Sequence, residues 1–418
     1  MQRRDVLIGS AVALAAAIPA TTVPHPARAA EPKKISLWHI YSREFDMIHL
    51  GIKLFNESQA EYRIEQRVIP YVQINPELIR ALATGTPPDL VVTNDPDIAG
   101  YSSQGQFVDI TDRVAKSSRI GAPDFFKGPA NSDQWRGRRY AVAREMNALS
   151  LYINDDLFRA KGLDPEKPPT TWSQVMAAAE KLTDPAARVF GFGFCAHSSE
   201  QATFQFLPWL WQAGGAMDRL DQPEATAALQ FWTDMVKRGF VSRDVINQQQ
   251  SEVMSTFLAG NTAFAVGGPW ELPRFATDAK FKWRVAPLPV KDDVKIEASS
   301  LGGFHFAIPK GAKEVDGAFM VIEQMLDAQL FRQGWNTGGI LAPRTDVEVP
   351  SPEWPQAYNV FRKQMISATQ RGPHPQWAAL SRPLQVAIQE ALTGTKPPAE
   401  ALAGAAAKIK PILAKVPL

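Results

Sequence analysis

The sequence predicts an α/β protein built from two domains, and three observations support this prediction. The chain has 418 residues, which is too long for one hydrophobic core. Its apolar and charged fractions, 45% and 21%, are ordinary for a soluble globular protein. Beyond an N-terminal leader, strand and helix patterns alternate, which is typical of a parallel sheet covered by helices.

The first residues have the pattern of an export signal. The Arg3–Arg4 pair precedes a largely apolar run, Val6–Ile18, and Ala27–Ala29 forms an A-x-A cleavage site. The apolar run is too short for a permanent membrane helix. The alternative is an ordinary amphipathic helix. We expect a twin-arginine signal peptide over residues 1–29, cleaved near Ala29, and a periplasmic mature protein.

Charge and cysteine content exclude several classes of function. Removal of the leader takes away three basic residues and one acidic residue, which leaves 42 of each sign. A neutral chain lacks the basic footprint of a nucleic-acid-binding protein and does not favour tight binding to an anionic membrane. The single cysteine, Cys195, excludes an internal disulfide and a cysteine-rich metal site. We expect no metal and no cofactor.

The first elements of the mature chain follow the order strand, helix, strand, helix, strand. Ser42 is a candidate helix N-cap, because apolar residues recur at helical spacing after it. The third strand is a continuous apolar run of the kind found in parallel sheets. The expected elements are a strand Ile35–Ile40, a helix reaching Phe55, a strand Tyr62–Val68, a helix Pro76–Thr84 closed by Gly85, and a strand Asp89–Thr93.

The rest of the chain continues this alternation. Thr171 and Gln174 form a Thr-x-x-Gln capping box at the start of a long helix. The expected strands are Tyr140–Val142, Ala148–Ile153, Val189–Phe194, Ala263–Val266, Trp283–Pro289 and Gly302–Pro309. The expected helices are one from Asp155, then Trp172–Leu182, Gln201–Ala213, Glu224–Lys237, Val253–Leu258, Val315–Leu330, and most of Glu353–Leu413.

The stretch Thr256–Arg274 contains the clearest candidate for a binding residue. A short apolar strand runs into Gly267-Gly268-Pro269, and the proline ends the strand because it cannot continue a ladder. Trp270 follows directly. An aromatic ring on a rigid turn at the open end of a sheet is a platform for the apolar face of a ligand such as a sugar. The alternative is a core tryptophan behind a turn.

Several motifs then occur in a distinctive order. They are Pro-Pro-Asp before the third strand, Leu-Tyr-Ile-Asn-Asp-Asp-Leu-Phe, Pro-x-Thr-Trp before a helix, Gly-x-x-Ala-Phe-x-x-Gly-Gly-Pro-Trp, Gly-Gly-x-x-x-Ala-Ile-Pro and Gly-Gly-x-x-x-Pro-Arg. Together they resemble the extracellular solute-binding proteins of carbohydrate importers of the ATP-binding-cassette (ABC) type, a broad family that includes the maltose-binding proteins. The resemblance extends from about Lys34 to the C-terminus.

This resemblance implies a periplasmic binding protein fold of type II, in which two α/β lobes are joined by several hinge crossings and close on a ligand in the cleft between them. It places an N-lobe at residues 34–146 and 303–343, and a C-lobe at 147–302 and 344–418. The implied crossings lie near Met146–Ala148, Ser300–Phe304 and Gly339–Arg344.

The resemblance also implies which residues contact the ligand. Polar side chains at turns would bond solute hydroxyls, Trp270 would stack on the solute, and two glycines would allow close backbone approach. A late aromatic contact of the relatives has no clear match here, and Trp377 or Arg382 is the nearest candidate. The expected ligand-binding residues are Ser42, Arg43, Asn94, Asp95, Asn147, Trp270, Gly302, Gly303 and Arg344.

The function that the resemblance implies is binding without catalysis. The protein would capture a sugar or short oligosaccharide in the periplasm, as a monomer without a membrane span, and deliver it to an inner-membrane permease. A polyol or glycerol phosphate ester is the alternative, since Arg43 and Arg344 would suit a phosphate. An exported glycan-active enzyme is less well supported, because no two carboxylates stand at a defined separation and no catalytic motif is present.

Overall fold

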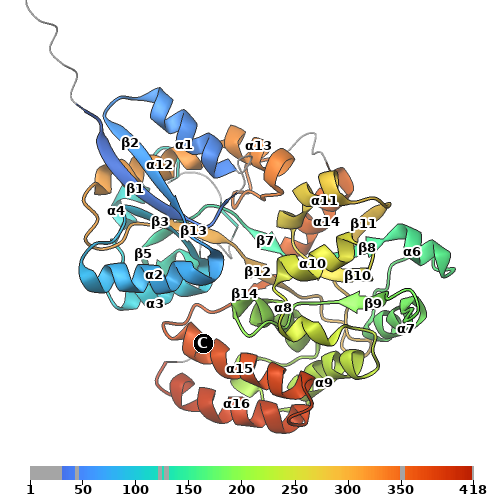
Figure 1. Ribbon diagram of the computed structural model, residues 1–418. Coiled ribbons are helices and arrows are strands. Elements are labelled where there is room, and N and C mark those ends of the chain that lie inside the picture. The colour runs from blue at the N-terminus through green and yellow to red at the C-terminus, as the bar shows by residue number, and fades with distance from the viewer. Residues whose placement is uncertain (1–30, 43–46, 121–124, 127–130, 349–353, 417–418) are drawn as a thin grey trace, which may run out of the picture.

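The structure is a computed structural model, and it divides visibly into two α/β lobes (Figure 1). It describes residues 31–42, 47–120, 125–126, 131–348 and 354–416. The expected signal peptide and Arg43 lie outside these residues. Among the described helices, none is both long and apolar enough to cross a membrane.

The N-lobe is built on a five-stranded sheet with the order β2-β1-β3-β13-β6. Strands β1, β2 and β3 are parallel, whereas β13 runs antiparallel to both β3 and β6. Figure 1 shows the late helices α12 and α13 beside the early helix α1 in this lobe. The strands are β1 Lys33–His39, β2 Tyr62–Val68, β3 Leu90–Asn94, β6 Ala141–Ala143 and β13 Phe304–Ala307. The helices are α1 Met47–Ser58, α2 Tyr71–Thr84, α3 Ile98–Ser103, α4 Thr111–Lys116, α12 Val315–Met325 and α13 Ala328–Gly338. A short hairpin comprises β4 Gln134–Trp135 and β5 Arg138–Arg139.

Both faces of this sheet are covered, because successive side chains of its strands point to opposite sides. Leu90 and Val92 of β3 pack in one cluster with apolar residues of α1, α12 and α13. Val91, between them, packs in a second cluster with residues of α2 and α3. A continuous apolar run in the sequence thus becomes a strand buried on both faces.

The C-lobe is built on a four-stranded sheet with the order β11-β8-β10-β9. Strand β8 is antiparallel to both of its neighbours, and β9 is parallel to β10. The strands are β8 Ser150–Asn154, β9 Phe190–Gly193, β10 Thr262–Gly267 and β11 Trp283–Ala286. The helices are α6 Asp155–Ala160, α7 Trp172–Leu182, α8 Glu200–Gln212, α9 Pro223–Lys237, α10 Gln250–Leu258, α11 Leu272–Asp278, α14 Pro355–Ile366, α15 Trp377–Leu392 and α16 Pro398–Leu413. Short 3-10 turns include η1 Asp95–Asp97, which follows β3 in the N-lobe, and η4 Pro269–Glu271, which follows β10 in the C-lobe.

A small third sheet lies between the lobes, with the order β14-β12-β7 (Figure 1). Its strands are β7 Asn147–Ala148, β12 Ser299–Gly302 and β14 Ala368–Gln370. The chain leaves the N-lobe sheet at β6, passes through β7 and enters the C-lobe sheet at β8. It returns through β12 into β13. A bridge between Met146 and Leu341 marks a third crossing beside these two.

Several expected elements differ from the observed ones. Helix α2 begins at Tyr71 rather than Pro76, so the proline lies inside the helix and does not begin it. The expected helix Val315–Leu330 is two helices, because Asp327 caps a new one with a bond from the backbone N–H of Gln329 (2.8 Å). The expected strand Gly302–Pro309 is also two strands, since the chain changes sheets at Gly303. The described part of α1 begins at Met47 and residues 43–46 lie outside the described residues, so the Ser42 N-cap stays a prediction.

Candidate functional site

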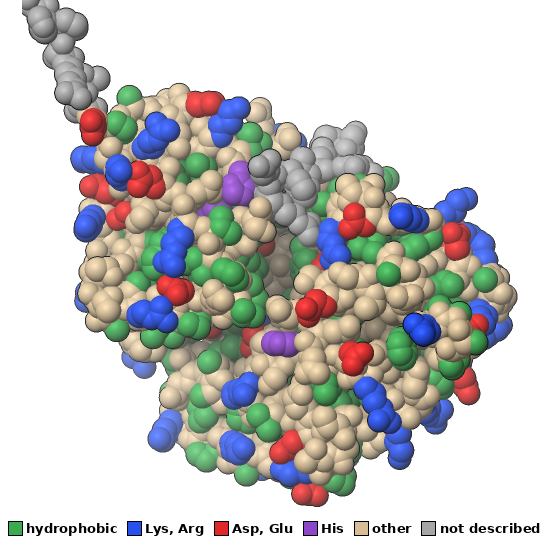
Figure 2. Space-filling view, in the orientation of Figure 1, with side chains coloured by type: hydrophobic (Ala, Val, Ile, Leu, Met, Phe, Trp, Pro, Cys, Tyr) green, Lys and Arg blue, Asp and Glu red, His purple; other side chains and the backbone are tan. Residues whose placement is uncertain are grey.

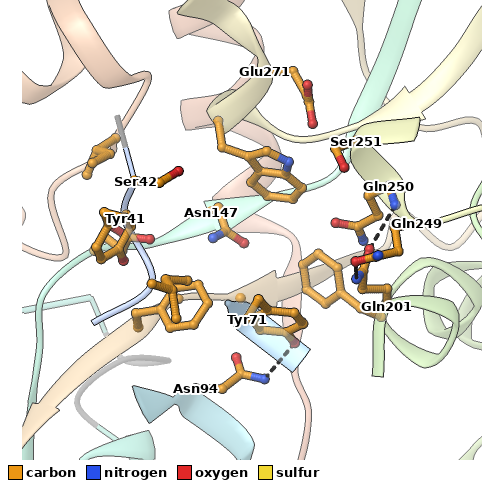
Figure 3. Close-up of a pocket in the computed structure, with 18 of the residues that line it drawn as sticks. Tyr41, Ser42, Tyr71, Asn94, Asn147, Gln201, Gln249, Gln250, Ser251 and Glu271 are labelled. Carbon is orange, nitrogen blue, oxygen red and sulfur yellow. Dashed lines mark hydrogen bonds between the residues drawn. The ribbon is translucent and has the colours of Figure 1, made fainter. Parts of the chain in front are cut away.

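A cavity of about 330 Å³ lies between the lobes. Figure 2 shows a hollow where the two lobes meet, and Figure 3 shows the side chains around it. The lining residues are Ile40, Tyr41, Ser42, Tyr71, Asn94, Glu145, Asn147, Gln201, Phe204, Gln249, Gln250, Ser251, Trp270, Glu271, Gly302, Gly303, Phe304, Ile340 and Arg371. Both lobes and the small sheet between them contribute to this wall.

The N-lobe contributes residues from the carboxyl ends of its parallel strands. Ser42 follows β1, and Asn94 is the last residue of β3. Ligands of open α/β sheets bind at this edge, because the chain must turn there and can expose polar side chains. The Nδ2 of Asn94 donates to the hydroxyl of Tyr71, the first residue of α2, at 3.3 Å (Figure 3). This bond orients the side-chain amide of Asn94 at the cavity wall.

The small middle sheet contributes Asn147, Gly302 and Gly303. A Cβ on Gly302 would lie 2.3 Å from Oδ1 of Asn147, and one on Gly303 would lie 2.3 Å from the carbonyl oxygen of Glu145. Both distances are too short for any larger residue. Glycine therefore allows the crossing strands to approach closely, which puts Asn147 in the middle of the cavity wall (Figure 3).

The C-lobe contributes Trp270 on the turn that follows β10. The hydroxyl of Tyr152 donates to the carbonyl of Gly268 (2.7 Å) and anchors this turn. A Cβ on Gly268 would lie 2.0 Å from the Trp270 ring, so the indole can fold over the turn only because a glycine is present. The Trp270 ring lies 6.3 Å from that of Phe204, at 42°. Trp270 remains half-buried, with a ring that borders the cavity.

A group of side-chain amides and one hydroxyl forms another part of the C-lobe wall, with Gln201 from α8 and Gln249, Gln250 and Ser251 from the start of α10 (Figure 3). Gln201 donates through Nε2 to Oε1 of Gln249 at 3.1 Å and accepts from the backbone N–H of Gln250 at 2.8 Å. These bonds join the beginnings of two helices into one polar surface.

Arg371 lies at the junction of the lobes, directly after β14. Its Nη1 donates to Glu200 of α8 at 2.9 Å, and its Nη2 bonds to the carboxylate of Asp95 and to Oδ1 of Asn94 (3.3 Å). The guanidinium also lies over the ring of Phe204, 4.6 Å from its centre. Only 3% of the Arg371 side chain is exposed. One buried cation therefore bonds a carboxylate from each lobe.

Burial changes the protonation of the acids beside Arg371. Burial raises the pKa of Asp95 to about 6, although Arg371 acts in the opposite direction. Burial also raises the pKa of Asp97, to about 7, against a hydrogen bond from Asn75 (2.6 Å). Burial alone would lower the pKa of Arg371, but Asp95 and Glu200 more than offset this effect and raise it. Arg371 is therefore charged, and its two carboxylate partners offset that charge.

A second ion pair lies beside the cavity. The guanidinium of Arg144 bonds to the carboxylate of Glu145 and lies over the Tyr41 ring, 3.9 Å from its centre. Arg144 is completely buried, whereas Glu145 borders the cavity. Glu271, also on the wall, is bonded to Arg274 at 3.0 Å. Each acidic residue of the wall thus has an arginine partner.

Three cavity residues carry a buried polar atom that has no hydrogen-bond partner within the described residues. They are the acceptor Oδ1 of Asn147 and the donors Nε2 of Gln250 and Nε of Arg371. Leaving such atoms unpaired is costly, at about 1–3 kcal/mol each. A ligand in this cavity that could both donate and accept hydrogen bonds would satisfy them.

The structure brings most of the residues expected from the sequence together. Six of them line the cavity: Ser42, Asn94, Asn147, Trp270, Gly302 and Gly303. Asp95 does not line the cavity; it lies behind the wall, where its carboxylate bonds to Arg371. Arg43 lies outside the described residues.

The expectation that Arg344 reaches into the cleft is not met. Its guanidinium bonds to Asp346 at 2.9 and 2.6 Å and to the carbonyl oxygen of Leu326 at 3.0 Å. The acid two residues along the chain therefore holds the side chain locally. Neither nearest candidate for the late aromatic contact lines the cavity. Trp377 is buried and donates to Glu200 (2.9 Å), and Arg382 donates to Ser198 (3.0 Å).

Sequence reasoning missed Arg371 and the amide group. Arg371 stands in Gln370-Arg371-Gly372-Pro373, where glycine and proline mark a loop but nothing marks a site. The run Gln248–Gln250 before an apolar helix was a usable signal, because it places three adjacent polar amides at a helix start. Tyr71 was missed because the helix was expected to begin later.

Two lobes around a cavity lined by aromatic and amide side chains define a ligand-binding protein with the periplasmic binding protein fold of type II. The chain belongs to the bacterial extracellular solute-binding protein family, whose model matches residues 52–362.

Solved relatives share this fold over nearly the whole chain. An ABC transporter solute-binding protein from Thermotoga lettingae, bound with α-D-tagatose, is 25% identical with a TM-score of 0.83, and the match covers 91% of this chain and 100% of that one. The maltose-bound MalE3 of T. maritima is 23% identical with a TM-score of 0.82, and the match covers 90% and 99%.

Among curated proteins, the sn-glycerol-3-phosphate-binding periplasmic protein UgpB of Brucella abortus (strain 2308) is 29% identical over 171 residues, 38% of each chain. The first curated relatives are matched over 58% or 38% of their own length.

Proposed function

We propose that this protein is the periplasmic solute-binding component of an ABC-type importer and that it captures a neutral sugar or short oligosaccharide between its lobes. The observation that carries the proposal is the chemistry of the cavity, where Trp270 and side-chain amides with unused donors and acceptors line one wall. A sugar ring offers an apolar face to an indole, and each of its hydroxyls both donates and accepts. The tagatose bound to a solved relative supports this class of solute.

The proposed contacts are those that line the cavity from both lobes. Trp270 stacks on the solute, Asn94 and Asn147 bond its hydroxyls, and Gly302 and Gly303 let the backbone approach it. Ser42 provides a further hydroxyl. An affinity in the micromolar range, about −8 kcal/mol, is in keeping with such a set of contacts.

The proposed mechanism is closure of one lobe on the other. The N-lobe comprises residues 34–146 and 303–343, and the C-lobe comprises 147–302 and 344–418, with the small sheet β14-β12-β7 as the hinge. The closed, loaded form is the one that a membrane permease would recognise. Export through the expected signal peptide would bring the protein to the periplasm.

A glycerol phosphate ester is the second candidate solute, and the similarity to UgpB favours it. The charges in the cavity do not. Arg371 is the one arginine on the wall among the described residues, and it already has two carboxylate partners. Arg344, which the sequence suggested for a phosphate, is bonded to Asp346 elsewhere. A neutral solute avoids placing a further negative charge beside Asp95 and Glu200.

A glycan-active enzyme has less support. Glycoside hydrolysis needs a pair of carboxyl groups, one of them protonated, on either side of the scissile bond. The carboxylates on the wall, Glu145 and Glu271, are each held by an arginine. The family that the chain belongs to is one of binding proteins.

The experiment that tests the proposal is thermal unfolding of the chain from Ala30 onward against neutral sugars, oligosaccharides, polyols and glycerol phosphate esters. A solute at about a hundred times its dissociation constant should add about 2.7 kcal/mol to the free energy of unfolding. We expect this with one group of neutral sugars. Mass spectrometry of the recovered sugar should show it unchanged. Stabilisation by glycerol phosphate esters alone would refute the neutral class, and turnover of the sugar would refute simple binding.

A further inference from the structure

The two carboxylates beside Arg371 carry more negative charge than is needed to neutralise its single positive charge. The guanidinium carries one positive charge and bonds to two carboxylates, those of Asp95 and Glu200. Its Nε has no hydrogen-bond partner within the described residues, although the side chain borders the cavity. Arg371 thus has one donor still available but no net charge to offer a solute.

The two carboxylates come from opposite lobes. Glu200 accepts further hydrogen bonds from the indole N–H of Trp377 (2.9 Å) and the hydroxyl of Ser381 (2.6 Å), both on α15. Asp95 directly follows β3, where its backbone N–H bonds to the carbonyl of Gly303 (3.2 Å). The two acids therefore approach the same guanidinium from opposite lobes, and Glu200 is held there by bonds of its own.

We infer that Asp95 and Glu200 determine the specificity of the cleft, because they neutralise Arg371 and so reserve the cavity for uncharged solutes. This inference rests on the proposed function and names its structural cause. If both acids lose their charge, the guanidinium of Arg371 becomes a receptor for an anionic group such as a sulfate, a phosphate ester or a carboxylate. The amide of Asn94, 3.3 Å from Nη2, would remain beside it.

The chain offers a matched control for the test. Arg284 also bonds two carboxylates, those of Asp155 (2.8 and 2.7 Å) and Glu166 (2.7 Å), within the C-lobe and outside the cavity wall. The double variants Asp95→Asn/Glu200→Gln and Asp155→Asn/Glu166→Gln remove the same charges from the two arginines. Isosteric amides keep the volume of each side chain.

The readout is thermal unfolding in sulfate and in chloride at equal ionic strength, at pH 7.5. We expect about 10 mM sulfate to raise the Tm of the Asp95→Asn/Glu200→Gln variant by about 2–3 °C relative to chloride. The wild type and the Arg284 control should show no such difference. An equal response to sulfate in all three proteins would overturn the inference.

A second measurement uses the wild type alone, in case the cleft variant does not fold. Because burial raises the pKa of Asp95 to about 6, that carboxylate is largely protonated at pH 5. Protonation of Asp95 removes one of the two negative charges beside Arg371, so sulfate should stabilise the wild type more at pH 5 than at pH 7.5, although less than it stabilises the double variant, and Arg371→Met should abolish this difference. The other groups that face this carboxylate are Arg371, Glu200 and His305, with Tyr71 and Asp97 close by. A sulfate effect that survives in Arg371→Met comes from one of the other groups and contradicts the inference.

The two proposals fail separately. The wild type tested with neutral sugars judges the proposed function, whereas the variants tested with sulfate judge the role of Asp95 and Glu200. Sugar binding by a wild type whose cleft variant gains no sulfate response would leave the function standing and overturn the inference. A sulfate response in the cleft variant without any sugar binding by the wild type would leave the inference standing and overturn the proposed function.

Discussion

Two arginines in this protein have the same kind of partners, two carboxylates each, but differ in burial and in their place in the fold. Arg284 bonds Asp155 and Glu166, and Arg371 bonds Asp95 and Glu200. The side chain of Arg284 is 19% exposed, and that of its partner Glu166 is 68% exposed. For Arg371 the exposed fraction is 3%, and one of its partners comes from the other lobe. The first cluster joins neighbouring elements at a surface, and the second lies where the lobes meet.

This difference teaches how context decides the role of an ion pair. Around Arg284, water reaches Glu166 and screens its pair with the arginine, so that pair contributes little to stability. Around Arg371, the arginine and Asp95 are almost completely buried, so each depends on its partners. The same residue types thus join neighbouring surface elements at one place and, in our proposal, set the charge of a binding cavity at the other.

Removing each arginine should give the largest contrast. Arg371→Met leaves the buried Asp95 and the partly exposed Glu200 without a counter-ion, and we expect a loss of about 3–5 kcal/mol in the free energy of unfolding. Arg284→Met should cost less, about 1–2 kcal/mol, because water reaches Glu166 and only Asp155 stays buried. Urea unfolding at pH 7.5 measures both. Equal losses would show that burial of the Arg371 cluster has no energetic consequence.

Uncharged side chains in the same two regions sharpen the comparison. Trp270 borders the cavity, and Trp283, next to Arg284, packs on Phe275 with its ring centre 4.6 Å away. Both indoles are half-buried. We expect Trp270→Ala to weaken solute binding by about 1.5–3 kcal/mol through loss of the stacking surface.

Trp283→Ala is the control for that experiment. It should lower the free energy of unfolding while leaving the dissociation constant nearly unchanged, because its ring lies against the C-lobe core. Isothermal titration with the sugar found by thermal unfolding measures both variants. Near-normal affinity in Trp270→Ala would remove the stacking contact from the proposed site.

The parts of this molecule that the sequence predicted well are those with local causes. Strand β2 and helix α7 have the expected bounds, because apolar periodicity and a Thr171 cap act over a few residues. Trp270 was predicted from a glycine turn at a strand end, whereas Asn94 and Asn147 were predicted from the family resemblance, and all three line the cavity. The position of Trp270 is recognisable without knowing what lies opposite.

What the sequence could not supply are contacts between distant residues. Arg371 is 276 residues from Asp95 and 171 from Glu200 in the sequence, and no local pattern predicts either bond. Arg344 was misplaced for the opposite reason, since its partner Asp346 is only two residues away and captures it locally. A charged residue near an expected cleft therefore needs its partners identified before it can be assigned to a ligand.

The pH dependence of stability should have opposite signs in the two clusters. Burial raises the pKa of the half-buried Asp97, beside Arg371, from 3.8 to about 7, so the folded protein binds a proton more readily than the unfolded chain. The stabilisation from that proton is complete below about pH 4 and is lost as the pH rises through 7. Asp97→Asn should thus be more stable than the wild type at pH 8, by about 1–2 kcal/mol, and should lose this advantage only as the pH falls to about 4. The bond to Arg284 lowers the pKa of Glu166, which therefore stabilises the fold above pH 4.5 and stops doing so as the pH falls. Glu166→Gln should be slightly less stable at pH 7 and equal to the wild type near pH 3. Urea unfolding across this range measures both variants, and parallel pH profiles would mean that burial does not separate the clusters.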